Sequence, residues 1–211
     1  MDKQKLLAEP QPLFVTGIGT DVGKTVVSAL LCQWLKANYW KPIQSGDPEG
    51  GDSKTIRKLV SHDGFQIFKE HYKFDTPISP HAAAQIEGRE IALNSISLPP
   101  SKRPLIIEGA GGLLVPLNYQ NETICDLILH LKASVIVVVK EYLGNINHTL
   151  LTIAHLRSQN INIAGFVFVG KELPHTWDIV SKTTGLPLLF RVPIFPKLDR
   201  STICNFTKKI S

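Results

Sequence analysis

Residues 14–28 read Phe-Val-Thr-Gly-Ile-Gly-Thr-Asp-Val-Gly-Lys-Thr-Val-Val-Ser, and this stretch decides the fold of the chain. An apolar run from Leu13 to Val15 ends at glycines, and Gly23-Lys24-Thr25 opens a run of helix-compatible residues. A strand, a glycine-rich turn and a helix N-terminus form a phosphate-binding loop, because free backbone N–H groups and the helix dipole both face the anion. In such a loop Lys24 reaches the outer phosphates and the Thr25 hydroxyl binds Mg²⁺.

The glycine spacing differs from that of the common phosphate loop. Five residues separate Gly17 from Gly23, where the common motif has four, and three residues separate Gly19 from Gly23. A Gly-Lys-Thr triplet also arises by chance in loops, but the strand before it and the helix pattern after it favour a phosphate site. The stretch therefore predicts a nucleoside triphosphate and Mg²⁺ as ligands.

Length and composition fit one globular domain with a large core. The chain has 211 residues, of which 43% are hydrophobic and 19% charged. Its formal charge of +5 and pI of about 9.1 suit nucleic acid or anionic small molecules equally. No Lys/Arg-rich run and no alternation of basic with aromatic residues is present, so a scattered basic surface is the better interpretation and no nucleic-acid partner is expected.

The cysteines and the N-terminus predict a cytoplasmic location. Cys32, Cys125 and Cys204 are far apart and form no paired motif, so each is expected to be a small buried apolar residue in a reducing compartment. Residues 1–12 are polar, lack the apolar core of a signal peptide and are expected to form a short tail. No segment approaches the length needed to span a bilayer, so no membrane partner is expected.

Apolar runs and helical periods alternate along the chain. Strands are predicted at 13–15, 39–44, 104–108, 134–139 and 163–169 and near Leu188, and Pro42 places the second strand at an end or edge of the sheet. Helices are predicted at 24–38, 53–60, 81–87, 123–131, 147–159 and 177–184 and from about Asp199, while 45–51 reads as a loop and 64–80 has no clear assignment. This order predicts one α/β domain of the phosphate-loop NTPase type, with a doubly wound, mainly parallel sheet and helices on both faces.

Several polar residues follow predicted strands, at the sheet edge where ligands bind. Glu108 ends an apolar strand before Gly-Ala-Gly-Gly, as the Mg²⁺ partner of a phosphate loop does, although a surface acid that caps a helix or forms a salt bridge is the alternative. Asp52 reaches the same metal, caps the helix near Ser53, or does both. Lys24 and Lys41 in one pocket would repel each other unless an anion lies between them, which favours polyanionic chemistry.

Five segments together resemble the dethiobiotin synthetase family of the biotin pathway, across nearly the whole chain. They are Thr-Gly-Ile-Gly-Thr-Asp-Val-Gly-Lys-Thr (16–25), Lys-Pro-Ile-Gln-Ser-Gly (41–46), Ser-Pro-His (79–81), Glu-Gly-Ala-Gly-Gly (108–112) and Leu-Gly-Asn-Ile-Asn-His (143–148). The first alone is shared by a broad group of phosphate-loop ATPases. The second and the last, in this order and at these separations, are far more specific.

The resemblance implies an ATP-dependent ligase that joins CO₂ to 7,8-diaminopelargonate and closes a ureido ring, giving dethiobiotin, ADP and phosphate. An amine of the substrate attacks CO₂ to give a carbamate, which accepts the γ-phosphoryl group to form a mixed anhydride. The second amine then displaces phosphate. The family acts with Mg²⁺ as homodimers whose substrate lies at the subunit interface.

The resemblance also implies roles for residues at the matching positions. Catalytic roles fall to Lys41, Lys24 and Thr20, and Mg²⁺ ligation to Thr25, Asp52 and Glu108. Substrate contacts are implied for Thr20, Lys41, Ser45, Gly111 and Gly112, and, in the partner subunit, for the segment that holds the substrate carboxylate: Leu143, Gly144, Asn145, Ile146 and Asn147. Nucleotide contacts are implied for Asp21, Val22, Gly23, Lys24, Thr25, Val26, Asp52, Glu108, Gly109, Ala110 and Gly111, and, around the base, for Val169, Gly170, Val192, Pro193 and Ile194.

Three features depart from the family pattern. Asp21 stands where a glutamate is familiar, and the segment between Leu35 and Lys41 is short. Val169-Gly170 stands where an asparagine that reads the adenine edge is often found. We therefore expect a weak preference for ATP over other triphosphates.

Three rival functions fit the phosphate loop alone. A partitioning-type ATPase that acts as a dimeric switch carries an additional lysine early in the loop, and residues 17–22 contain none. An amidoligase of the cobyrinic acid synthase type needs a glutaminase segment for which no length remains. A non-catalytic nucleotide-binding regulator is disfavoured because Lys24, Thr25, Lys41, Asp52 and Glu108 are all present.

Overall fold

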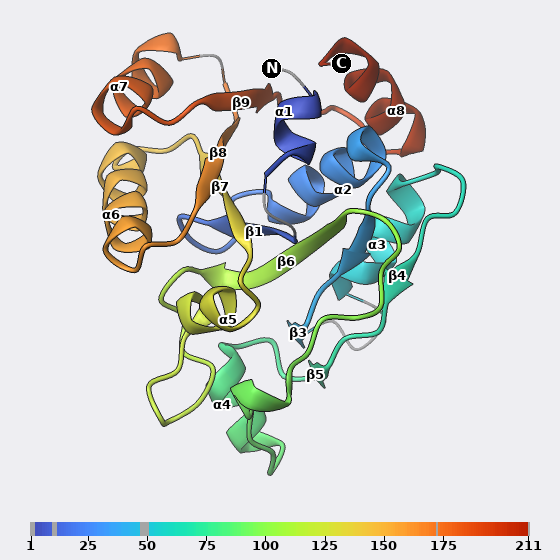
Figure 1. Cartoon of the computed structure of the whole chain (residues 1–211), viewed down its shortest axis with the longest axis vertical. Coiled ribbons are helices and arrows are strands. Elements are labelled where there is room, and N and C mark those ends of the chain that lie inside the picture. The colour runs from blue at the N-terminus through green and yellow to red at the C-terminus, as the bar shows by residue number, and fades with distance from the viewer. Residues whose placement is uncertain (1–2, 10–11, 47–50, 172, 211) are drawn as a thin grey trace.

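A seven-stranded sheet forms the centre of the protein in a computed structural model that describes residues 3–9, 12–46, 51–171 and 173–210 (Figure 1). All neighbouring strands in it are parallel. Their order across the sheet is β4 (Ile67–Phe68), β2 (Asn38–Trp40), β6 (Leu105–Gly112), β1 (Leu13–Gly17), β7 (Ser134–Lys140), β8 (Ile163–Val169) and β9 (Leu188–Val192). A small second sheet pairs β3 (Ile43–Ser45) with β5 (Tyr72–Phe74).

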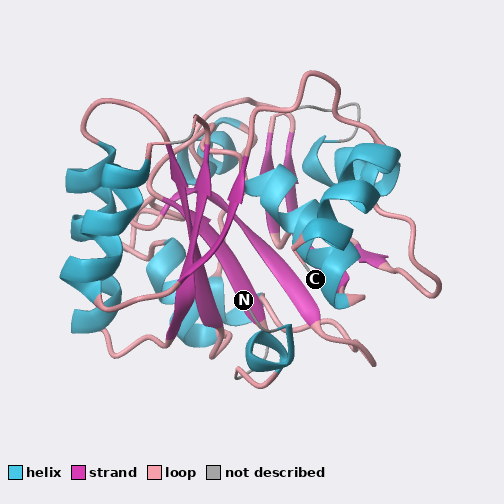
Figure 2. Ribbon diagram, turned by 90° about the horizontal axis from the view of Figure 1, so that it is seen from above, coloured by secondary structure: helices cyan, strands magenta, loops and turns pink. Residues whose placement is uncertain are grey.

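Helices cover both faces of the large sheet (Figure 2), which confirms the predicted α/β architecture. One hydrophobic core lies under α1 (Lys3–Leu7), α2 (Lys24–Leu35), α3 (Gly51–Leu59) and α8 (Arg200–Lys209). The other lies under α4 (Pro80–Ile86), α5 (Ile124–His130), α6 (Asn145–Ser158) and α7 (Pro174–Thr184), with a 3₁₀ turn at Leu93–Ser95. Residues 134–139 of β7 are buried throughout, as expected for a strand covered on both faces.

The predicted strand 39–44 is instead two strands in different sheets. β2 ends at Trp40 and pairs in the large sheet, whereas β3 begins at Ile43 and pairs with β5. Pro42 has no N–H to donate to a ladder, and its carbonyl accepts hydrogen bonds from His71 and Tyr72. The chain therefore changes sheets at Lys41-Pro42, directly beside the phosphate loop.

Other element boundaries differ from those predicted. β6 runs on through the glycines to Gly112, so Glu108 lies inside a strand rather than at its end. Residues 64–80, which had no assignment, contain the two short strands β4 and β5. α6 begins at Asn145, two residues earlier than predicted, and of the predicted loop 45–51 residues 47–50 lie outside the described residues.

Two expectations about single segments were wrong. Residues 3–7 form helix α1 rather than a tail, because Leu6 packs into the core under α2 with 1% of its surface exposed. Cys32 and Cys125 are buried, but Cys204 is only half-buried on α8. All three are free thiols.

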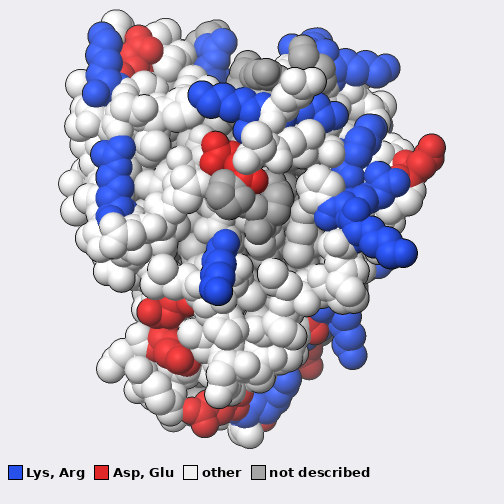
Figure 3. All heavy atoms as spheres, in the orientation of Figure 1, with Lys and Arg blue, Asp and Glu red and all other residues white. Residues whose placement is uncertain are grey.

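Lys and Arg side chains lie on several parts of the face shown in Figure 3, and a group of them is gathered on its right-hand side. Within the described part of the chain, no helix combines the length and apolar character that crossing a bilayer requires.

Replacing Leu6 with Ala tests whether α1 is part of the core. We expect Leu6→Ala to lower the free energy of unfolding by about 2–4 kcal/mol, because the substitution leaves a cavity under α1. Urea denaturation measures the change, with the exposed Lys5→Ala as the matched control on the same helix. Equal stability of the two variants would contradict the packing of this segment.

Candidate active site

The phosphate loop connects β1 to α2 and is held by its own side chains and by neighbouring strands. Lys24 Nζ donates a hydrogen bond to the Gly19 carbonyl at 2.9 Å, and Lys140 Nζ, at the end of β7, donates to the Asp21 carbonyl at 3.0 Å. Gly23 has a φ of 96°, and a Cβ there would lie 3.3 Å from a methyl of Val169 at the end of β8. A glycine is therefore required where the loop enters the helix.

Lys24 is buried, with 8% of its surface exposed. Burial, opposed in part by the charge of Glu108, lowers the pKa of its ammonium group from 10.5 to about 8. The nearby charge of Lys41 lowers it further. A polyanion placed beside Lys24 would favour the charged form and raise this pKa again.

Thr25, Asp52 and Glu108 converge, although they come from α2, α3 and β6. The Thr25 hydroxyl oxygen lies 2.8 Å from Asp52 Oδ1 and 2.8 Å from Glu108 Oε1. A hydroxyl has a single hydrogen and donates to only one of these oxygens at a time. The Thr25 oxygen and the other carboxylate oxygen then lie 2.8 Å apart with no hydrogen between them. A cation would stabilise this arrangement.

Lys41, which lies between β2 and β3, forms ion pairs with the carboxylates of Asp52 and Glu108. Its Nζ forms an ion pair with Asp52 Oδ2 and lies 3.4 Å from Glu108 Oε1. Burial alone would lower the pKa of Lys41, but the charges of Glu108 and Asp52 outweigh it and raise that pKa. Burial alone would raise the pKa of Asp52, but the charge of Lys41 and its hydrogen bond outweigh burial and lower that pKa. Lys41, Asp52 and Lys24 are therefore predominantly charged at neutral pH.

One sequence-based alternative made Asp52 the N-cap of the helix near Ser53, and this alternative was wrong. Asp52 lies in the first turn of α3, with its carboxylate facing the phosphate loop. The side-chain oxygen Oε1 of Gln44 accepts a hydrogen bond from the Asp52 backbone N–H at 3.2 Å and so links β3 to this turn. The alternative in which Asp52 reaches the phosphate loop agrees with the structure.

These residues open onto a cavity of about 710 Å³. The cavity wall includes most of the residues predicted for nucleotide phosphates, metal and acceptor: Thr20, Asp21, Gly23, Lys24, Thr25, Val26, Lys41, Ser45, Asp52, Glu108, Ala110 and Gly111. Among the described residues, the buried Ser45 hydroxyl has no hydrogen-bond partner, so it is free to bind a ligand. The structure thus brings together residues from four separate segments of the chain.

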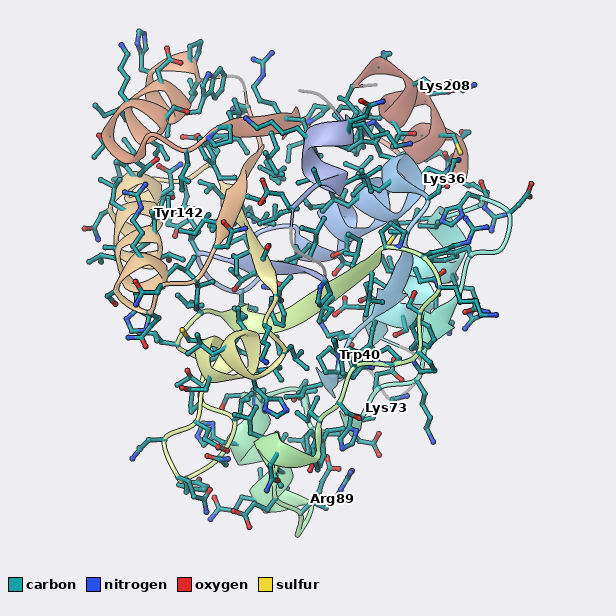
Figure 4. All side chains as sticks on the ribbon, viewed as in Figure 1. Lys36, Trp40, Lys73, Arg89, Tyr142 and Lys208 are labelled. Atoms are coloured by element: carbon teal, nitrogen blue, oxygen red, sulfur yellow. The ribbon has the colours of Figure 1, made fainter. Side chains whose placement is uncertain are left out.

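Other predicted site residues do not line this cavity. Val22 packs in the core, Gly109 lies against the Phe14 ring, and Gly112 is in contact distance of Gly19. The segment from Leu143 to Asn147 begins α6, and Leu143 is fully exposed. Near it, Figure 4 labels Tyr142, whose hydroxyl lies 2.7 Å from His148 Nδ1.

The residues predicted around the base lie at the ends of β8 and β9. Gly170 N–H donates to the Val192 carbonyl at 3.0 Å, which joins the two strand ends. Gly170, Pro193 and Ile194 line a second cavity of about 580 Å³, with aromatic side chains of Phe168, Trp177, Phe190 and Phe206. Arg191 lies over the Trp177 ring, 4.9 Å from its centroid.

Sequence reasoning missed several residues of the first cavity. Pro77, Ile78, Ser79 and Pro80 form one wall, and Gln44 and Val115 complete it. The Ser-Pro-His segment (79–81) could have indicated that wall.

Tyr39 does not line the cavity, but its hydroxyl donates to Glu108 Oε2 at 2.9 Å. Its sequence pattern is that of an ordinary apolar strand residue, so nothing in the sequence indicated this contact.

The residues present fit a magnesium ion. One hydroxyl and two carboxylates provide hard oxygen ligands, and Mg²⁺ keeps several waters, so this small set suffices. No group of three or more His, Cys, Asp or Glu residues suited to a metal occurs in the described ranges, and the Thr25 hydroxyl is therefore an essential member of the set.

We expect binding of a nucleotide polyphosphate to be coupled to proton uptake by Lys24. The pKa of Lys24 is about 8 in the free protein, so at pH 7 it is already protonated and uptake is small. Above pH 8 uptake rises toward one proton and affinity falls, by up to tenfold per pH unit, because the bound anion needs the charged form. Calorimetry with metal-free ADP, in buffers of different ionisation enthalpy between pH 7 and 9, measures both.

The matched control is Lys197→Ala, which removes an exposed lysine of a surface ion pair and should leave uptake unchanged. A pH-independent affinity across this range would contradict the assignment to Lys24.

Solved structures with a similar fold include a plasmid partition protein and a cell division ATPase. A putative plasmid partition protein from Borrelia burgdorferi, bound to AMPPNP, matches with a TM-score of 0.58 at 12% identity, covering 96% of each chain. The cell division ATPase MinD from Pyrococcus furiosus matches with a TM-score of 0.57 at 13% identity, covering 95% of this chain and 98% of the other. At this identity the likeness shows the fold alone.

Sequence relatives give the family. A family model described as an AAA domain matches residues 11–202. ATP-dependent dethiobiotin synthetase from Christiangramia forsetii is 46% identical over 95% of this chain and 96% of its own length. The synthetase of the same name from Cytophaga hutchinsonii is 46% identical, over 93% of this chain and 95% of its own length. Because these relatives are 46% identical over more than 90% of the chain, the chain belongs to the dethiobiotin synthetase family.

Proposed function

We propose that this chain is an ATP-dependent dethiobiotin synthetase of biotin biosynthesis, an ATP-dependent ligase. The observation that carries the proposal is the convergence of Lys24, Lys41, Thr25, Asp52 and Glu108 on one cavity. Relatives that share up to 46% identity over nearly the whole chain bear this name. A family model that spans residues 11–202 supports one synthetase-like domain over 1–211.

The finer proposal is that the chain joins CO₂ to 7,8-diaminopelargonate and closes the ureido ring with ATP. Attack of one substrate amine on CO₂ gives a carbamate, attack of the carbamate on the γ-phosphorus gives a mixed anhydride and ADP, and the second amine displaces phosphate. Two anions must meet in the second step, and Lys24 and Lys41 supply positive charge on the same cavity wall. Thr20 and Ser45 provide hydroxyl groups there for the diamine or its carbamate.

Mg²⁺ is proposed as the resident cofactor, held by Thr25, Asp52 and Glu108. When bound, it supplies positive charge that draws the phosphates and the carbamate together. The two lysines and two carboxylates balance in the ligand-free site, so the anionic ligands need the added positive charge. Lys41 is then free to leave Asp52 for the acceptor anion.

A homodimer in the cytoplasm is proposed for the assembly. The segment Leu143–Asn147 would take the substrate carboxylate at the N-terminus of α6 of the partner subunit, where backbone N–H groups are available. The exposed side chains of Leu143 and Leu151 support an apolar contact at α6. Three free thiols support a reducing compartment.

A partitioning-type ATPase is the rival function, and no observation favours it over the synthetase. Partition and cell division ATPases share the fold at 12–13% identity. The additional early-loop lysine expected of a partitioning-type ATPase is absent, because residues 17–22 contain no lysine.

Phosphate release in the presence and absence of the acceptors tests the function. With diaminopelargonate and bicarbonate, ATP hydrolysis should rise strongly and dethiobiotin should appear by mass spectrometry in equal amount. ATP hydrolysis that is indifferent to the diamine would exclude the synthetase function and favour a switch ATPase.

In the same assay Lys41→Ala should lower kcat at least about 100-fold, because it removes a preorganised charge from the developing anion. Lys197→Ala, with a side chain 83% exposed, is the control and should match wild type. Thermal unfolding of each variant separates loss of turnover from loss of fold. Near-normal turnover of a folded Lys41→Ala variant would refute the role of Lys41.

Weak base selectivity is expected from the second cavity. Its wall near Gly170 and Pro193 is mainly aromatic and apolar, which suits stacking against any base. We expect kcat/KM values for CTP, GTP and UTP within about tenfold of that for ATP, a factor that corresponds to roughly 1.4 kcal/mol. Turnover measured with the four triphosphates decides the matter, and a strong preference for ATP would contradict it.

A further inference from the structure

Tyr39 contacts Glu108 from the core side of the sheet, and none of the roles assigned above involves it. It is fully buried on β2, and its hydroxyl donates to Glu108 Oε2 at 2.9 Å. In the sheet register Tyr39 pairs with Ile106, two residues before Glu108. Because side chains two residues apart on a strand share a face, Tyr39 and Glu108 lie on the same face, under α2. Figure 4 labels the adjacent Trp40, near the small sheet.

The two oxygens of the Glu108 carboxylate have different partners. Oε1 lies 2.8 Å from the Thr25 hydroxyl and 3.4 Å from Lys41 Nζ, on the side of the cavity. Oε2 is bonded to Tyr39 on the side of the core. Without that donor, a carboxylate oxygen would be buried and unsatisfied, and rotation of the carboxylate would relieve it only by withdrawing Oε1 from Thr25.

We propose that Tyr39 is a positioning residue for the divalent metal, whose hydroxyl fixes Glu108 so that only Oε1 faces the ion. The inference rests on the magnesium site proposed above. Partners of this kind behind a metal ligand set its orientation and typically change metal affinity by 10–100-fold.

A tyrosine suits this position because it donates a hydrogen bond without adding charge. A lysine or arginine at the same place would neutralise Glu108 and weaken its attraction for a cation. The Tyr39 hydroxyl donates to Glu108 Oε2 at 2.9 Å and leaves Oε1 to the cavity side.

Mn²⁺ binding to full-length protein with ADP, followed by electron paramagnetic resonance, tests the proposal. Tyr39→Phe should weaken Mn²⁺ binding about tenfold or more, while ADP affinity in a metal chelator stays the same. Tyr72→Phe is the matched control, because its hydroxyl lies 2.9 Å from Ser95 Oγ beside the small sheet, away from the cavity wall. It should bind Mn²⁺ as wild type does.

Combining Tyr39→Phe with Glu108→Gln separates positioning from packing. If Tyr39 acts through Glu108, its removal should change Mn²⁺ affinity less than twofold in the Glu108→Gln background. An equal loss in both backgrounds would overturn the proposal, as would a loss of metal-free ADP binding equal to the loss of Mn²⁺ binding.

A measurement on the wild-type chain covers the case in which Tyr39→Phe does not fold. The chain has four tyrosines, so ¹³Cζ resonances of labelled tyrosine can be assigned by elimination with Tyr72→Phe, Tyr119→Phe and Tyr142→Phe. Addition of Mg²⁺ with ADP should shift the Tyr39 resonance and leave that of Tyr72 unmoved.

The outcomes distinguish this inference from the metal site on which it rests. Unchanged Mn²⁺ affinity in a folded Tyr39→Phe variant, or a Tyr39 resonance that Mg²⁺ does not move, would overturn the positioning role alone. Failure of the wild-type protein to bind Mn²⁺ with ADP would overturn the magnesium site as well.

Discussion

Charge compensation between Lys41 and the carboxylates of Asp52 and Glu108 is the interaction on which the rest of the site depends. Glu108 is buried inside β6, where an uncompensated charge would be strongly destabilising. Lys41, nearly as buried, lies 3.4 Å from it, and the charges of Glu108 and Asp52 outweigh burial and raise the pKa of Lys41. The Mg²⁺ and polyanions proposed above would exchange with this pairing when they bind.

The sheet supplies the rigidity that such a site needs. β1, β6 and β7 are parallel neighbours whose side chains are buried on both faces. The start of the phosphate loop at the end of β1 and the position of Glu108 within β6 are therefore fixed. Pro42 ends the pairing of β2 with the large sheet, and Lys41 beside it lines the cavity. The small sheet begins after Pro42, and residues 77–80, which follow its strand β5, form another part of the cavity wall.

The same architecture serves proteins with other functions, so the fold by itself says little about the reaction. A plasmid partition protein and a cell division ATPase share the fold at 12–13% identity. What separates this chain from them is 46% identity to a dethiobiotin synthetase over nearly its full length.

Sequence alone determined the features that depend on neighbouring residues: the phosphate loop, the alternation of strands with helices, and the polar residues that follow β1 and β2. Only the tertiary structure decided that Glu108 lies within β6, that Leu6 packs under α2, and that Tyr39 holds the far oxygen of Glu108. Tyr39 and Glu108 are separated by 69 positions, and an apolar strand pattern does not indicate where a hydroxyl points. Contacts between distant segments are set by packing, which a local pattern cannot express.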